Sequence, residues 1–90
     1  MSRITAEEFV DQLSNDLTLL REEKYQRHDP EYYAEHEYYN DFHTSIPCEL
    51  LLTPAYTAFI EEYVFNKSNL HDAVLAFICA YDEYKNSKVV

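Results

Sequence analysis

The histidines carry the most versatile chemistry in this sequence, and their spacing limits what they can do. His36 and His43 are seven positions apart, which corresponds to two turns, or about 10 Å, along a helix. Two histidines four positions apart can bind one metal ion, but this pair is too widely spaced to share one. The sequence also lacks the Glu-x-x-His and His-Glu-x-x-His patterns of helical metal sites. We therefore expect no metal ion and no cofactor.

Short patterns that occur in enzymes are present but incomplete. His28-Asp29 and His71-Asp72 each form a dipeptide found in some metal phosphohydrolases, and Arg21 with His28 fits a loose Arg-x(4–6)-His spacing of some small helical ribonucleases. The phosphohydrolases need several further ligands, and a chain with a net charge of −10 repels RNA. The sequence therefore favours a non-catalytic protein, with an enzyme as the least favoured class.

The charge balance restricts the partners. Seventeen acidic residues against seven basic ones argue against direct binding to nucleic acid or an anionic membrane, since both need basic residues to neutralise phosphate. The first eight residues lack the apolar stretch of a secretory signal, and no apolar run is long enough to span a membrane. Cys48 and Cys79 then read as reduced thiols. We expect a cytoplasmic protein, or one in the host cytoplasm if a phage encodes it.

One stretch concentrates the negative charge. Residues 29–44 contain five acidic residues, four of the nine tyrosines and no lysine or arginine. On a helical wheel, one face carries an aromatic and histidine stripe that is expected to pack on the rest of the protein: Tyr32, His36, Tyr39 and His43. The opposite, outward half carries Glu31, Glu35, Tyr38 and Asp41, with Glu37 at its edge.

The outward half is the predicted partner-binding site. Like charges four positions apart destabilise an isolated helix by a few tenths of a kcal/mol, roughly, and a cationic partner would relieve this repulsion. We expect Glu31, Glu35, Glu37 and Asp41 to contact basic groups, with Tyr38 as the aromatic anchor. Asp29 is expected to cap the helix. The competing interpretation is that this face is simply solvated.

These features predict an acidic binding protein that occupies the basic, nucleic-acid-binding surface of a protein partner. Rows of carboxylates resemble the phosphates of a DNA strand, so the protein is expected to act as a DNA mimic. Phage inhibitors of host nucleases, restriction systems or CRISPR effectors share this composition. Two alternatives remain open: an immunity protein or antitoxin that neutralises a basic toxin or nuclease, and a homodimeric regulatory subunit.

The elements that must position these residues are predicted to be helices. Glycine is absent, which disfavours tight β-turns and excludes glycine-rich phosphate loops. We predict an all-α bundle of about four helices in a single domain, residues 1–90. The helices are expected at residues 5–27, 30–43, 54–65 and 69–85, with a short helical turn near 47–52. Thr5 and Glu8 have capping-box spacing. A strand is the alternative for Leu50 to Thr53, because so short an apolar run has no decisive periodicity.

The last predicted helix is apolar on almost every side. Its inward face carries Leu70, Val74, Phe77, Ile78 and Tyr81. Leu75 and Cys79 extend its apolar character to the opposite side. Such a helix lies either at the centre of a bundle or against a partner. The protein is therefore expected to be a monomer with this helix enclosed, or a homodimer that uses Leu75 and Cys79 as its interface.

Overall fold

The computed structural model describes residues 4–26 and 33–87, and every element within these ranges is helical. The elements are α1 (Ala6–Leu19), α2 (Glu23–Gln26), α3 (Tyr33–Ser45), α4 (Cys48–Leu51), α5 (Pro54–Ile60), the π-helical turn η1 (Glu61–Phe65) and α6 (Leu70–Ser87). The predicted all-α class is confirmed. Leu50 and Leu51 belong to a short helix, as the main prediction for residues 47–52 required, and not to a strand.

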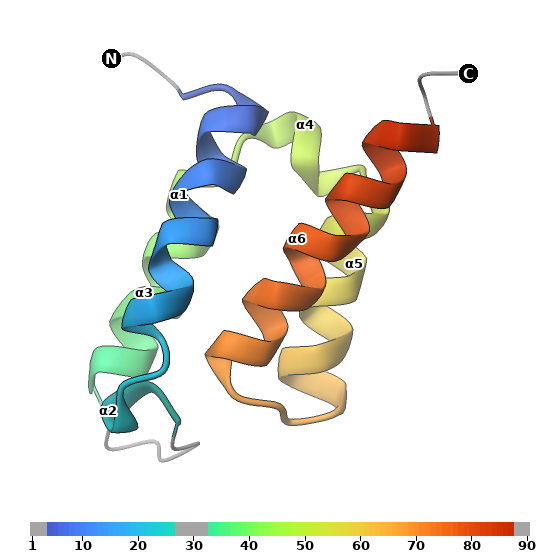
Figure 1. Ribbon diagram of the computed structural model, residues 1–90. Coiled ribbons are helices and arrows are strands. Elements are labelled where there is room, and N and C mark those ends of the chain that lie inside the picture. The colour runs from blue at the N-terminus through green and yellow to red at the C-terminus, as the bar shows by residue number, and fades with distance from the viewer. Residues whose placement is uncertain (1–3, 27–32, 88–90) are drawn as a thin grey trace.

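The four longer helical segments alternate in direction (Figure 1). From the start of α1 the chain runs to the far end of the bundle, returns along α3, runs away again along α5 and η1, and returns along α6. The small helix α2 lies at the far end, and α4 crosses from α3 to α5 at the near end. The start of α1, the end of α3, α4 and the end of α6 therefore share one end of the bundle.

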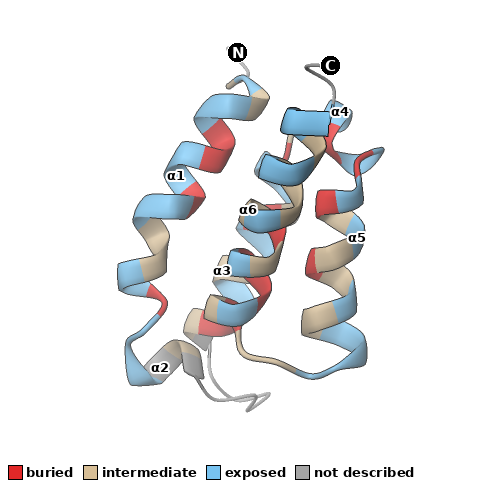
Figure 2. Ribbon diagram, turned by 45° about the vertical axis from the view of Figure 1, so that its right-hand side comes forward, coloured by how far each residue is buried: buried red, intermediate tan, exposed pale blue. Residues whose placement is uncertain are grey.

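Phe42 of α3 lies at the centre of the core because its ring contacts one phenylalanine from each of the other long helices. The rings of Phe42 and Phe59 stack with centroids 4.1 Å apart, while Phe9 and Phe77 each lie 5.5 Å from Phe42. Figure 2 shows the buried positions on the sides of the helices that face one another. The remaining buried apolar side chains are Val10, Leu13, Leu20, Ile46, Leu50, Ala55, Leu70, Ala73 and Val74.

Local hydrogen bonds explain where the helices begin. Thr5 accepts a hydrogen bond from the backbone N–H of Glu8 (3.2 Å), which confirms the predicted cap of α1. At α6 the side chain of Asn69 accepts from the backbone N–H of Asp72 (2.9 Å). Thr53 precedes the proline that opens α5, but its hydroxyl donates back to the carbonyl of Leu50 (2.7 Å) and does not cap the new helix.

Two boundaries differ from the prediction. The helix predicted at residues 5–27 stops at Leu19, and the chain turns through Leu20 to Glu22 before α2 begins. The turn places Leu20 entirely within the core. The second predicted helix runs two residues beyond its predicted end, to Ser45, and its predicted start at residue 30 and the Asp29 cap lie outside the described residues.

The helix predicted at residues 54–65 has its expected span, but its last turn widens into η1. The backbone N–H of Asn66 bonds to the carbonyl of Glu61, five residues earlier (2.9 Å). Lys67 then has a φ of 57°, in the left-handed region that glycine usually occupies at the end of a helix. A sequence without glycine thus ends this helix at some conformational cost. The last helix, α6, extends two residues beyond the predicted 69–85 at its carboxyl end.

Candidate acidic interface

The predicted partner-binding face of α3 is only partly exposed. Glu37 and Asp41 lie at the surface, as expected. Glu31 lies outside the described residues. Glu35 and Tyr38 were expected to face outward, and the structure places both toward the bundle. Of the predicted carboxylates that the structure describes, Glu37 and Asp41 thus remain on the outward face of α3.

Glu35 is buried, with 3% of its surface exposed, and this corrects the prediction that it faces outward. Its carboxylate accepts a hydrogen bond of 2.7 Å from the hydroxyl of Tyr63 in η1. Glu35 also lies in the first turn of α3, where the helix dipole favours a negative charge. Burial of this side chain is therefore compensated by a specific donor and by its place in the helix.

Tyr38 holds α3 to α1 and does not act as an outward anchor. Its hydroxyl donates a 2.9 Å hydrogen bond to the carboxylate of Asp16, and its ring meets the ring of Tyr25 edge to face at 6.1 Å. Burial, and then the neighbouring charge of Asp16, raise the pKa of Tyr38 well above its usual value. The side chain is therefore neutral and tied to α1 at physiological pH.

The two histidines of the predicted packing face separate in the structure. His43 packs as expected: its Nδ1 lies 3.1 Å from the carbonyl of Tyr39, and its Nε2 lies 3.1 Å from the hydroxyl of Tyr56. The carbonyl of Tyr39 can only accept, so Nδ1 donates to it, and the hydroxyl of Tyr56 can donate to or accept from Nε2. His36, in contrast, is exposed, which corrects its expected packing role.

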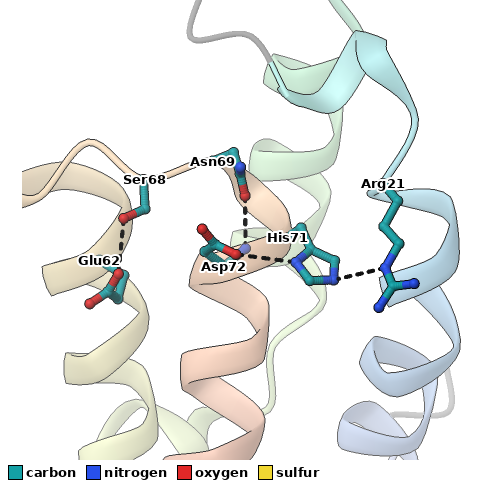
Figure 3. A network of polar contacts seen from close by, with 6 residues as sticks. All are labelled: Arg21, Glu62, Ser68, Asn69, His71 and Asp72. Carbon is teal, nitrogen blue, oxygen red and sulfur yellow. Dashed lines mark hydrogen bonds and ion pairs between the residues drawn. The ribbon is translucent and has the colours of Figure 1, made fainter.

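Arg21, His71 and Asp72 form the polar cluster that most resembles a catalytic arrangement (Figure 3). The Nε of Arg21 lies 3.4 Å from Nε2 of His71, and Nδ1 of His71 lies 3.2 Å from a carboxylate oxygen of Asp72. With Nδ1 donating to Asp72, the lone pair of Nε2 accepts from Arg21. Both ring nitrogens of His71 are thus engaged, so the cluster joins the turn after α1 to the start of α6, and the imidazole offers no lone pair to a substrate.

Of the short enzyme patterns in the sequence, this cluster contains His71-Asp72, and the other two include His28. Arg21 meets His71, which lies 50 positions away, and its predicted neighbour His28 lies outside the described residues. Within residues 4–26 and 33–87, no group of three or more histidine, cysteine, aspartate or glutamate side chains is placed to hold a metal ion.

A gathering of exposed carboxylates lies at another place, the end of the bundle where α1 begins and α6 ends. We call this surface the acidic end. It comprises seven exposed acidic residues from four helices: Glu7, Glu8, Asp11, Asp41, Glu49, Asp82 and Glu83. The contact between Phe9 and Phe42 places Asp41 level with the first turns of α1. The sequence signal was the pair of acidic runs at residues 7–11 and 82–83, but their proximity depends on the antiparallel packing of α1 and α6.

Lys85 is the one basic residue of the described chain at the acidic end, and it is already engaged. Its ammonium lies 2.8 Å from the carboxylate of Glu7. This hydrogen bond and the lysine charge lower the pKa of Glu7, and the same contact raises the pKa of Lys85. The other six carboxylates of the acidic end take part in no ion pair with another described residue. A cationic partner would therefore meet carboxylates that form no ion pair with a lysine or arginine of the described chain.

A groove between α1 and α6 continues the acidic end toward the middle of the bundle. It is lined by the carboxylates of Glu7, Asp11 and Asp82 and by Ile78 and Cys79. Cys79 and Leu75, the alternative dimer surface, are both exposed on α6. Two copies that met through Cys79 would bring these carboxylates together, which disfavours the dimer electrostatically.

Comparison with protein-family models, with curated proteins and with solved structures finds no significant match to this chain. In the part of the chain that the structure describes, no helix combines the length and apolar character needed to cross a membrane.

Proposed function

We propose that this protein is a non-catalytic acidic binding protein whose acidic end occupies the basic, nucleic-acid-binding surface of a protein partner. The observation that carries the proposal is that α1, α3, α4 and α6 place seven exposed carboxylates at one end of the bundle, where Lys85, the one lysine among the described residues there, already binds Glu7. Glu37, one helical turn before Asp41 on the outer face of α3, adds to this surface. Glu35 and Tyr38 serve it indirectly, because they fix the rotation of α3 about its axis.

The mechanism we propose is competition with nucleic acid. Carboxylates held on rigid helices reproduce the fixed negative charge of phosphates, so they attract the lysine and arginine side chains that bind DNA or RNA. Part of the driving force comes from the release of counterions, as it does when such a protein binds nucleic acid. Because the carboxylates are mounted on a packed bundle, little conformational entropy is lost when they bind. More specifically, we propose that the protein is a phage-encoded inhibitor of a host nuclease, restriction enzyme or CRISPR effector.

A pair of matched charge-reversal variants tests the proposal. Asp82→Lys with Glu83→Lys alters the acidic end, and Glu22→Lys with Glu23→Lys makes the same change in net charge at the opposite end of the bundle. Lysines near the carboxyl end of α6 complement its dipole, so the first variant should keep its fold. Each chain is used for affinity capture from native host lysate that has been treated with nuclease, after circular dichroism has verified its helix content.

We expect the wild-type chain and the Glu22/Glu23 variant to capture the same nucleic-acid-binding protein, and the Asp82/Glu83 variant to lose it. Equal capture by both variants would show that the acidic end is not the binding site. Equal loss in both would show that net charge alone matters and would contradict a localised interface.

A further inference from the structure

The outer side of α5 and η1 exposes large apolar side chains at both of its ends. Leu52, just before α5, has 91% of its surface exposed, and Phe65, the last residue of η1, has 75% exposed. Their neighbours Leu51 and Val64 are 41% and 46% exposed. Single exposed apolar residues are ordinary on a protein surface, but this set borders one continuous element.

Two shallow hollows connect these apolar ends. One is lined by Tyr56, Ile60 and Phe65, and the other by Leu51, Leu52 and Pro54, and the two share Thr57 and Glu61. We call the surface formed by Leu52, Thr57, Glu61 and Phe65 the α5 face. Figure 2 shows exposed positions along α5, and Ala80 of α6 borders the second hollow. At 1.5 Å per residue the face is about 15–20 Å long, which matches about three turns of a second helix.

The charge of the α5 face restricts what can cover it. Among the residues that the structure describes, Glu61 is the one charged residue that lines either hollow, and no lysine or arginine lines them. Glu62, the next residue, is also acidic and receives hydrogen bonds from Ser68 and Asn66. An occupant with apolar side chains along one stripe and positive charges beside it would complement this surface.

A second copy of the chain is a poor occupant. In a two-fold dimer the same patch meets itself, so Glu61, at the middle of the face, would lie near its own copy. Each chain also carries a net charge of −10, which adds repulsion over a longer range. A cationic partner is therefore better suited than a second copy of the chain to cover the apolar side chains of Leu52 and Phe65.

We propose that the α5 face binds an amphipathic, lysine- or arginine-rich helix of a partner protein. Helix-in-groove recognition places apolar anchors at i, i+3, i+4 and i+7 into such a surface, and flanking positive charges would reach Glu61. None of the residues of the acidic end takes part, so this surface is distinct from the one that carries the proposed function.

The test uses the full chain labelled with nitrogen-15 and two synthetic helical peptides. Both peptides carry leucines at i, i+3, i+4 and i+7, and one has lysines and the other glutamates at the remaining positions. Amide chemical shifts are recorded during titration with each peptide. The variants are Leu52→Ser with Phe65→Ser, the charge variant Glu61→Lys, and the acidic-end variant Asp82→Lys with Glu83→Lys as the matched control.

The lysine peptide should shift amides around Leu52, Thr57 and Phe65, and the glutamate peptide should not. Loss of the two apolar side chains should weaken binding at this face about tenfold or more, since each is an exposed side chain that the peptide buries. Glu61→Lys should also weaken it, even if the serine variant loses helix content, while Asp82→Lys with Glu83→Lys should leave binding at the α5 face within about twofold. The proposal is overturned if the shifts are confined to the acidic end, if both peptides bind equally, or if sedimentation shows a wild-type dimer that the serine variant abolishes.

Discussion

The hydroxyl of Tyr63 donates a 2.7 Å hydrogen bond to the carboxylate of Glu35, a glutamate of which 3% is exposed. This contact joins η1 to the first turn of α3. Together with the bond from Tyr38 to Asp16, it ties α3 to the helices on both of its sides. The two contacts fix which face of α3 points to solvent, and that face carries Glu37 and Asp41.

Removal of the Glu35 carboxylate should destabilise the protein. Glu35→Ala deletes the acceptor for Tyr63 at a buried position, and we expect the free energy of unfolding to fall by about 1–3 kcal/mol. Glu35→Gln keeps an acceptor oxygen and should recover a large part of that loss. Urea unfolding followed by circular dichroism measures both. A loss below about 0.5 kcal/mol for Glu35→Ala, typical of a surface site, would contradict the burial of this side chain.

The buried tyrosines should make the protein sensitive to alkaline pH. Burial raises the pKa of Tyr38 and of Tyr63 above the ordinary value of 10.0, with further contributions from Asp16 and Glu35. The unfolded chain therefore loses these protons first, so unfolding is favoured as pH rises above about 10. The stabilising contribution is complete below that pH and is lost as pH increases toward the folded-state pKa.

Urea unfolding of the wild type and Tyr38→Phe between pH 8 and pH 11 measures this effect. Ionisation of one such tyrosine contributes a slope of about 1.4 kcal/mol per pH unit, and this contribution should disappear in Tyr38→Phe. At pH 8 the variant should itself be less stable by about 1 kcal/mol, because its ring lacks the hydroxyl that bonds to Asp16. Identical slopes in the two chains above pH 10 would show that Tyr38 is not shielded from solvent.

The position of Phe42 predicts the largest single loss of stability. Its ring contacts Phe9, Phe59 and Phe77, so Phe42→Ala leaves a cavity between all four long helices. The expected cost is about 3–5 kcal/mol, a large part of the roughly 5–15 kcal/mol that stabilises a typical domain. Leu52→Ala is the control, because that side chain is almost fully exposed and should change stability by less than about 0.5 kcal/mol. Equal thermal midpoints for the two variants would contradict this core.

The sequence was sufficient for the features that depend on local chemistry. The capping pair of Thr5 and Glu8 and the buried positions Leu70, Val74 and Phe77 of the last helix follow from spacing alone. The orientation of α3 did not. A helical wheel gives two alternative inward stripes, one through His36 and His43 and one through Glu35, Phe42 and Ile46. The second stripe is buried because Phe42 and Ile46 remove more apolar surface from water than two histidines can.

The acidic end could not be predicted because it depends on long-range packing. Its carboxylates come from residues 7–11, 41, 49 and 82–83, and they gather only when α6 returns antiparallel to α1. Because residues 29–44 are rich in acidic side chains, we predicted the interface on α3. In the structure, Glu35 is buried and Tyr38 packs against α1. Local charge density in the sequence and exposed charge density in the fold are thus different quantities.

The salt dependence of affinity tests most directly whether the acidic end imitates phosphates. The protein captured from lysate is titrated with the wild-type chain and with the Asp82→Lys, Glu83→Lys variant between 50 and 200 mM salt. Displacement of phosphates by carboxylates predicts that the wild-type affinity falls by about tenfold or more over this range, and that the variant binds more weakly with a shallower salt slope. A wild-type affinity that is the same at both salt concentrations would contradict the account.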